Sequence, residues 1–271
     1  MSNFDKTASS YSNNAFLQNQ AAKKNIMNLK KVIRSTDSII DLGCGSGENT
    51  SKIADLTTGK VLGIDISNEM IARANDRHKK KNLNFQHLSM EDINLNNQFD
   101  CAFSNSSIYY IKQRRECYEK IYNSLKKDGV LVLQASYRDL HSKQFMKALN
   151  CTINENTYLK DIYMEHNNPV WLYPSKQAMI DEFELCGFKC INYYSEEQDS
   201  NMSIQQAINQ FETNAFPSIF NPENYNTPNK VTSMYCEQMK EGIEFFLYEQ
   251  LDHNNLIKIV IPRIYLILKK I

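Results

Sequence analysis

The chain has 271 residues, and its 31 lysines and arginines balance 31 aspartates and glutamates, so the formal net charge is zero. A chain of this length can bury a full hydrophobic core, and we expect one domain with elaborations. The charge is divided between a basic first part and an acidic second part, which argues against nucleic acid as the main partner, because phosphate binding favours a basic surface.

The charge is unevenly divided along the chain. Residues 1–150 carry 22 Lys+Arg against 15 Asp+Glu, and residues 151–271 carry 9 against 16. The two parts therefore have net charges of +7 and −7. A basic patch on the first part stays possible, and the acidic second part favours a cationic ligand over an anion.

The cysteines and the first residues of the chain indicate the cellular compartment in which we expect the protein. The seven cysteines form no C-x-x-C pair, and we expect reduced thiols without disulfide or metal roles. The chain opens on Met-Ser-Asn-Phe-Asp-Lys rather than a basic and then apolar signal, and no apolar run approaches the roughly 18 residues of a membrane span. These features predict a soluble, cytoplasmic protein without a membrane partner.

In chain order, the first predicted element is a helix over residues 4–33, where apolar residues recur at three- and four-residue steps. Tyr11, Gln18 and Gln20 lie in this segment, ahead of the first predicted strand. We expect the segment to fold over a bound cofactor.

A strand, a glycine-rich turn and a helix follow. Ile39 and Ile40 begin an apolar strand that runs into Gly43, Gly45 and Gly47. Glycine carries no Cβ, so the backbone can turn sharply there and come close to a ligand. A second apolar strand over 61–64 ends on an acid, and an acid at that position can bind the two ribose hydroxyls of a nucleoside.

The spacing of the glycines distinguishes between nucleosides. A dinucleotide-binding G-x-G-x-x-G pattern would place its third glycine at position 48, which is Glu48. The pattern Asp41-x-Gly43-x-Gly45-x-Gly47 instead resembles motif I of the class I S-adenosylmethionine-dependent methyltransferases. The resemblance implies a Rossmann-like α/β fold, with a seven-stranded, mostly parallel sheet, an antiparallel last strand and helical lid insertions.

The resemblance also implies cofactor-binding positions. Asp65 matches the ribose-binding acid, Ile66 and Met70 match the residues around adenine, and a helix to about residue 80 follows. A strand over 83–88 leads to a position where the family usually has Asp. Here it is Ser89, and Glu91 is an alternative acceptor. The complete predicted set is Tyr11, Asp41, Gly43, Gly45, Gly47, Asp65, Ile66, Met70, Ser89, Met90, Glu91 and Asn105.

The middle of the chain predicts two more strands. Residues 99–104 form the fourth strand, and the loop that starts at Asn105 and contains Tyr109 should face the methyl group, since ligands bind beyond the carboxyl ends of parallel strands. A helix over 114–127, a turn at Asp128-Gly129 and a fifth strand over 130–135 follow. Residues 138–175 match a lid position and contain Trp171.

The last third predicts a helix over 176–186 closed by Gly187, a strand over 188–194, helical stretches at 203–212 and 230–250, and a β-branched strand over 256–268. A proline inside such a strand belongs at an edge or a bend. We expect the domains 1–35 (helical cap), 36–136 (cofactor-binding core), 137–175 (lid), 176–194 (core helix and strand), 195–255 (second helical insertion) and 256–271 (closing strand).

Both ends of the chain resemble carboxyl O-methyltransferases. The spacing of Phe4, Ala8, Tyr11, Ala15, Leu17, Gln18, Gln20 and Ala22 resembles the opening of the malonyl-thioester O-methyltransferases of biotin synthesis. Ile-Pro-Arg-Ile-Tyr, from residue 261, is similar to the closing strand of trans-aconitate methyltransferase.

No His or acid occupies an obvious base position at a strand tip, which fits an acceptor that is already ionised, such as a carboxylate. We therefore expect carboxyl O-methylation of a small or carrier-linked acid, with Gln18, Gln20, Tyr109 and Trp171 around the acceptor. N-methylation of a small cationic amine stays the alternative, because of the acidic second part. A third possibility is a non-catalytic subunit that binds S-adenosylmethionine.

Overall fold

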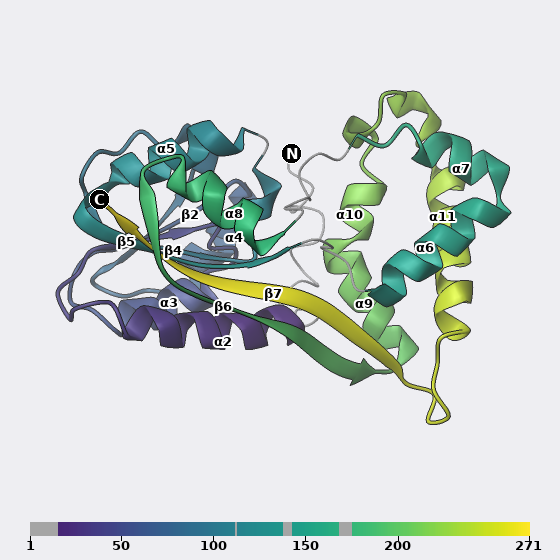
Figure 1. Cartoon of the computed structure of the whole chain (residues 1–271), viewed down its shortest axis with the longest axis horizontal. Helices are drawn as coiled ribbons and strands as arrows, with labels where there is room; N and C mark the ends of the chain where they lie inside the picture. The colour runs from purple at the N-terminus through teal and green to yellow at the C-terminus, as the bar shows by residue number, and fades with distance from the viewer. Residues whose placement is uncertain (1–15, 112, 138–142, 168–174) are drawn as a thin grey trace.

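The computed structural model describes residues 16–111, 113–137, 143–167 and 175–271. A sheet covered by helices forms one end of the molecule, and a group of helices forms the other (Figure 1). The strands are β1 (Ile39–Leu42), β2 (Val61–Asp65), β3 (Leu83–His87), β4 (Phe99–Asn105), β5 (Leu125–Ser136), β6 (Phe188–Met202) and β7 (Ile257–Lys270).

The helices are α2 (Phe16–Lys30), α3 (Glu48–Ala54), α4 (Asn68–Arg77), α5 (Arg114–Ser124), α6 (Lys143–Glu155), α7 (Thr157–Tyr163), α8 (Lys176–Glu184), α9 (Ile204–Asn214), α10 (Phe216–Ile219) and α11 (Ser233–Tyr248), with 3₁₀ turns η1 (Met90–Asp92), η2 (Ile108–Tyr110), η4 (Pro222–Asn224) and η5 (Pro228–Lys230). Within the described ranges, none of these helices is both long and apolar enough to cross a membrane.

The strands form one sheet in the order β3-β2-β1-β4-β5-β7-β6. The pairs among β1 to β5 are parallel, and β7 is antiparallel to both of its neighbours, β5 and β6. The predicted seven-stranded, mostly parallel sheet with an antiparallel last strand is therefore confirmed. The order reverses between β1 and β4, and such a switch point is where open α/β sheets bind ligands.

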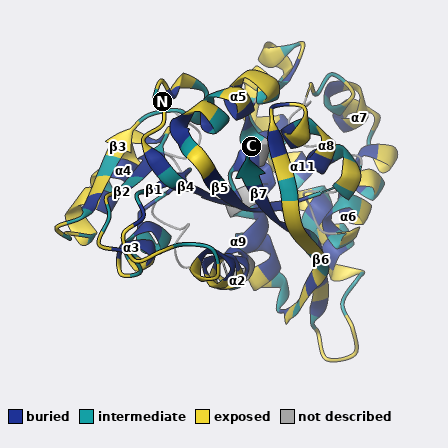
Figure 2. Cartoon of the chain, turned by 60° about the vertical axis from the view of Figure 1, so that its left-hand side comes forward, coloured by how far each residue is buried: buried dark blue, intermediate teal, exposed yellow. Residues whose placement is uncertain are grey.

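The central strands of the sheet are largely buried (Figure 2), because apolar side chains cover both faces of the sheet. On one face, α5 and α8 pack onto β4, β5 and β7, and Tyr118 stacks on Phe183 with ring centroids 4.1 Å apart. On the other face, Ile26 and Leu29 of α2 and Ile53 of α3 cover β1, β2, β4 and β5. Residues that alternate along β5 and β7 thus face α2 or α8 in turn.

A second core holds the helical group together. Phe145 of α6 packs against Phe211 and Phe216, and α11 contributes Tyr235 and Met239. The start of β7 enters the same core, through Ile257, Ile259 and Ile261. β7 therefore joins the helical group to the sheet, as Figure 1 shows.

Several element boundaries differ from the predictions. The strand predicted over 188–194 is too short. In the structure β6 continues to Met202, because the residues after 194 pair with β7. The predicted helix over 114–127 ends at Ser124, and β5 already begins at Leu125. Asp128, with φ +63°, therefore turns the chain inside β5 rather than between a helix and a strand. The proposed domain limits stay predictions.

Pro262 illustrates why an apparent central strand tolerates proline. In β7 it pairs with Glu197 of β6, while the pairing with β5 ends at Arg263 opposite Ser136. At Pro262, therefore, β7 has passed the end of β5, and β6 is its only neighbouring strand among the described residues. A proline at such a position agrees with the expected edge or bend.

Candidate functional site

The turn after β1 depends on glycine. Gly43, Gly45 and Gly47 have φ values of 74°, 55° and 85°, in the region that only glycine enters readily. A Cβ on Gly43 would lie 2.4 Å from Ser107 Cβ, whereas a Cβ on Gly45 would meet no atom within 4 Å. The turn is thus packed beneath Gly43 and open at Gly45, so a ligand can approach the backbone at Gly45.

The end of β2 is tied to this turn. Gly45 N donates to Asp65 Oδ2 at 2.8 Å, and Ser67 N donates to Asp65 Oδ1 at 2.8 Å. A carboxylate can accept about four hydrogen bonds, so these two amides do not exhaust its capacity. The donors orient the carboxylate beside the open part of the turn, where it can meet the hydroxyls of a ribose.

Asp41 lies below the turn rather than on its surface. It is 2% exposed and accepts a 2.6 Å hydrogen bond from Thr50 Oγ1. Burial raises the pKa of Asp41 to about 7, the Thr50 bond opposes this rise, and the charge of Asp65 adds to it. Asp41 therefore stabilises the turn from below through its hydrogen bond with Thr50, and its raised pKa reflects its burial.

The two apolar residues predicted around adenine have contrasting environments. Ile66 directly follows β2, and its side chain is 52% exposed. Met70 in the first turn of α4 is 3% exposed, and its amide donates to the Ser67 hydroxyl that caps the helix. An exposed Ile66 offers apolar surface to a flat ring, and a buried Met70 offers at most a support.

The segment after β3 approaches the same turn. Ser89 caps η1 by accepting from Glu91 N at 3.2 Å, so its hydroxyl is engaged locally. Glu91 Oε1 accepts from Gln113 N at 2.9 Å. Met90 Cε would lie 3.7 Å from a Cβ on Gly43. Of this segment, Met90 is the residue in direct reach of the glycine turn.

Beside the turn, the ends of β4 and β5 carry amides. Asn105 ends β4 opposite Gln134 of β5. Asn105 Oδ1 and Gln134 Nε2 are both buried and have no hydrogen-bond partner among the described residues. Gln134 Oε1 accepts from Ser106 Oγ at 2.7 Å. A buried amide group without a partner costs stability, so it marks a place where a ligand can complete the bonding.

One further strand away lies a charged residue that the sequence analysis did not select as a site residue. Arg263 of β7 is 2% exposed, and it donates from Nε to Gln198 Oε1 at 3.1 Å and from a terminal nitrogen to Ser136 Oγ at 3.0 Å. A charge at the centre of the β-branched run 256–268, whose other charge is Lys258 near its start, was the signal that could have identified it.

One of the predicted acceptor residues, Gln20, contacts the partner of Arg263, and another, Gln18, contacts α9. Gln20 Oε1 accepts from Gln198 Nε2 at 3.0 Å, which connects α2 to the partner of Arg263. Gln18 is 9% exposed, and its Oε1 accepts from Gln210 Nε2 of α9 at 2.9 Å. Tyr11 and Trp171 lie outside the described residues, as does the side chain of Tyr109.

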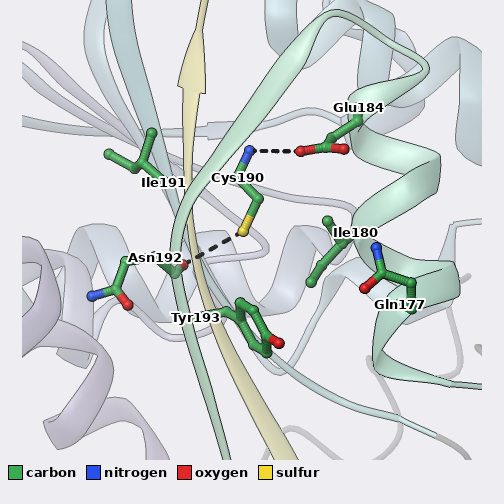
Figure 3. Close-up of a pocket in the computed structure, with 7 residues that line it drawn as sticks. All are labelled: Gln177, Ile180, Glu184, Cys190, Ile191, Asn192 and Tyr193. Carbon is green, nitrogen blue, oxygen red and sulfur yellow. Dashed lines mark hydrogen bonds between the residues drawn. The ribbon is translucent and has the colours of Figure 1, made fainter.

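A separate pocket lies on the outer strand of the sheet, away from this region. It is lined by Gln177, Ile180 and Glu184 of α8 and by residues 190–193 of β6 (Figure 3). Cys190 N donates to Glu184 Oε1 at 3.1 Å across it. The pocket contains none of the predicted site residues and plays no part in the arrangement at the carboxyl ends of the strands.

Comparison with known proteins identifies the family of this chain. A family model described as a methyltransferase domain matches residues 33–213. The malonyl-[acyl-carrier protein] O-methyltransferase of Acetivibrio thermocellus is 30% identical over 143 residues, which are 51% of this chain and 50% of that protein. The trans-aconitate 2-methyltransferase of Deinococcus radiodurans is 30% identical over 118 residues, 43% of this chain and 44% of that protein.

The chain thus spans about half the length of each of these two relatives. Among solved structures, the YcgJ protein from Bacillus subtilis has a TM-score of 0.59 at 15% identity and covers 92% of this chain and 98% of its own. At that identity the likeness concerns the fold. The family predicted from the glycine pattern and from both chain ends is confirmed by the family match.

Proposed function

This chain belongs to the methyltransferase domain family, as a class I S-adenosylmethionine-dependent member, and we propose that it methylates an oxygen of a small or carrier-linked carboxylic acid. One observation carries the choice of acceptor. The carboxyl ends of β4 and β5 and the middle of the antiparallel β7 present Asn105, Gln134, Ser136 and Arg263, and none of these side chains can take a proton from the acceptor. Such a site suits an acceptor that is already an anion.

S-adenosylmethionine fits the turn after β1 and the end of β2. The open space at Gly45 would admit the ligand, and Asp65, oriented by two amides, would hold the ribose. Bound there, the cofactor supplies a methyl group activated by its positive sulfur. The rest of the proposed cofactor set is Tyr11, Asp41, Gly43, Gly47, Ile66, Met70, Ser89, Met90, Glu91 and Asn105.

The transfer is an in-line displacement that balances without a base. A lone pair of the carboxylate oxygen forms the new O–C bond while the methyl carbon loses its bond to sulfur. The products are a methyl ester and S-adenosylhomocysteine, and no proton moves. The work of the chain is to align the acceptor and to exclude water, and alignment alone can contribute about 7–11 kcal/mol.

We propose that the acceptor binds near the polar side chains of Gln198, Ser136 and Arg263. Gln20 reaches this region through Gln198, whereas Gln18 is held by Gln210 of α9. Both glutamines would then act by fixing other side chains as well as by direct contact. We propose that Tyr109 and Trp171 also line the acceptor site. A cytoplasmic location, without a nucleic-acid or membrane partner, stays a prediction.

The names of two relatives support an acid as the acceptor, since they specify a malonyl carrier and trans-aconitate. The acidic second part of the chain supports an amine instead. Several of its acids are neutralised by lysines, however: Glu196 pairs with Lys24, Glu197 with Lys143, Asp199 with Lys258 and Glu212 with Lys240. Net charge is therefore a weak guide to the potential at the site.

The test is transfer of a labelled methyl group from S-adenosylmethionine to a panel of mono- and dicarboxylic acids, an acyl-carrier thioester of a dicarboxylic acid, and small primary and secondary amines. We expect base-labile methyl esters from at least one acid. Base-stable methylation confined to amines would reject the carboxylate proposal. Binding of S-adenosylhomocysteine without transfer to any acceptor would favour the non-catalytic subunit.

A further inference from the structure

Arg263 is a buried cation whose hydrogen bonds to described residues go to neutral groups. Two of its N–H groups donate to described acceptors, the amide oxygen of Gln198 and the hydroxyl of Ser136. The side chain is 2% exposed, and a guanidinium stays protonated in proteins whatever its surroundings. Removing such a charge from water costs several kcal/mol unless an anion accompanies it.

No anion of the described chain fills that role. None of the ion pairs formed by described residues includes Arg263. The acid that faces it across the strand pair is Glu196 of β6. Glu196 is engaged elsewhere, because it accepts from Tyr265 Oη at 3.0 Å and pairs with Lys24.

The surroundings orient the guanidinium without neutralising it. Gln198 fixes the Nε side, and its own amide nitrogen is held by Gln20 of α2 at 3.0 Å. Ser136, the last residue of β5, fixes a terminal nitrogen. A charge oriented by neutral groups and left without a counterion is the arrangement expected of a site that receives its anion from a ligand.

The position of Arg263 indicates which part of a ligand it would meet. The sheet order places β7 two strands from β4, whose last residue is Asn105 beside the glycine turn. Neighbouring strands are roughly 4.8 Å apart, so the two strands are about 10 Å apart. The guanidinium reaches towards Ser136 of β5, so a group bound there lies between one and two strand spacings from the group that meets the methyl beside the turn.

We infer that Arg263 binds a second carboxylate of the methyl acceptor, so that the acceptor carries an anion at each end and the end remote from Arg263 is methylated. This inference rests on the proposed carboxyl methylation and specifies its substrate class. An acceptor with one carboxylate and no second anion would leave the buried guanidinium unpaired and would be discriminated against.

The test measures binding separately from turnover. Straight-chain dicarboxylates of four to six carbons and their monomethyl esters are titrated by calorimetry into the protein saturated with S-adenosylhomocysteine. The proteins are the wild type, Arg263→Gln, Arg263→Lys and the control Lys258→Gln. Lys258 lies in the same strand and is exposed, so its variant removes an equal charge from the surface of β7.

We expect wild type to bind at least one dicarboxylate more tightly than its monomethyl ester. Arg263→Gln should lose at least about 30-fold in dicarboxylate affinity, the loss typical of a buried ion pair that loses one partner. Its affinity for the monomethyl ester should change far less. Arg263→Lys should recover part of the loss, and Lys258→Gln should match wild type.

Unchanged S-adenosylhomocysteine affinity and cooperative unfolding of Arg263→Gln would exclude a general folding defect. The inference is overturned if no dicarboxylate binds wild type, or if Arg263→Gln and Arg263→Lys bind dicarboxylates and monoesters as wild type does. It is also overturned if both variants lose S-adenosylhomocysteine binding together with dicarboxylate binding. Dicarboxylates that bind through Arg263 but receive no methyl group would reject the proposed function alone.

Discussion

Gly45 N lies 2.8 Å from Asp65 Oδ2 and donates a hydrogen bond to it. This bond joins the turn after β1 to the end of β2, two elements that meet because β1 and β2 are parallel neighbours in the sheet. The acid proposed to hold the ribose therefore also holds the glycine backbone that the cofactor would approach. A substitution of Gly45 or Asp65 is therefore expected to affect both the glycine turn and the proposed ribose contact.

The first prediction concerns this acid. Asp65→Ala should weaken S-adenosylhomocysteine binding by about 1.5–3 kcal/mol, the usual loss for hydrogen bonds to a charged group, or roughly 10- to 150-fold. Calorimetric titration measures the effect. Asp55→Ala is the matched control, because Asp55 is 66% exposed and pairs with Lys80 at the surface. Equal affinities for wild type and Asp65→Ala would mean that the ribose is held elsewhere.

The second prediction separates two glycines of one turn. Gly45→Ala adds a Cβ that meets no atom within 4 Å, so the fold should lose only about 1–2 kcal/mol for the left-handed backbone. If the cofactor lies there, its binding should fall far more than the stability does. Gly43→Ala should instead unfold the chain readily, since its Cβ would lie 2.4 Å from Ser107 Cβ.

A double variant checks the reason for the Gly43 effect. Ser107→Gly removes the atoms that the new Cβ meets, at the cost of the 2.7 Å hydrogen bond from Ser107 Oγ to Leu42 O. Urea unfolding of Gly43→Ala, Ser107→Gly and the double variant gives a coupling free energy. We expect the double variant to be more stable than the two single effects added together. If the two effects simply add, the backbone strain at Gly43, rather than contact with Ser107, causes the loss of stability in Gly43→Ala.

Much of the core was predictable because its signals are local. The strand that begins at Ile39, the glycines after it and the acid after β2 follow one another within 28 residues of sequence, from 38 to 65, and each forms its part of the site with close neighbours. The seven-stranded, mostly parallel sheet with an antiparallel last strand then followed from the family resemblance. The turn and Asp65 are accordingly where sequence and structure agree best.

Residues whose roles depend on distant partners escaped the sequence analysis. Arg263 acquires its surroundings from Ser136 and Gln198, which are 127 and 65 positions away. The polar residues after 194 lack an apolar alternation, so nothing in them predicted that β6 would extend to Met202 beside β7. Gln18 and Gln20 were selected from a family resemblance, and their glutamine partners could not be read from the sequence.

The third prediction concerns the helical group. Gly242 lies inside α11, where alanine would normally be better by about 1 kcal/mol. A Cβ there would lie 2.4 Å from Thr152 Cγ2 of α6, so Gly242→Ala should lower the thermal midpoint instead. Thr152→Ala removes that methyl group and should restore most of the loss in the double variant. A Gly242→Ala protein as stable as wild type would contradict the close packing of α6 on α11.

The fourth prediction follows from Asp41, whose pKa is raised by burial from the ordinary 3.8 to about 7, against the opposing Thr50 hydrogen bond. Between these values the folded chain keeps a proton that the unfolded chain has lost, so the contribution of Asp41 to stability falls as pH rises from about 4 to 7 and is constant above. Urea unfolding across pH 4–8 measures it. Asp41→Asn should gain stability relative to wild type as pH rises. A difference between Asp41→Asn and wild type that stays constant with pH would refute the raised pKa.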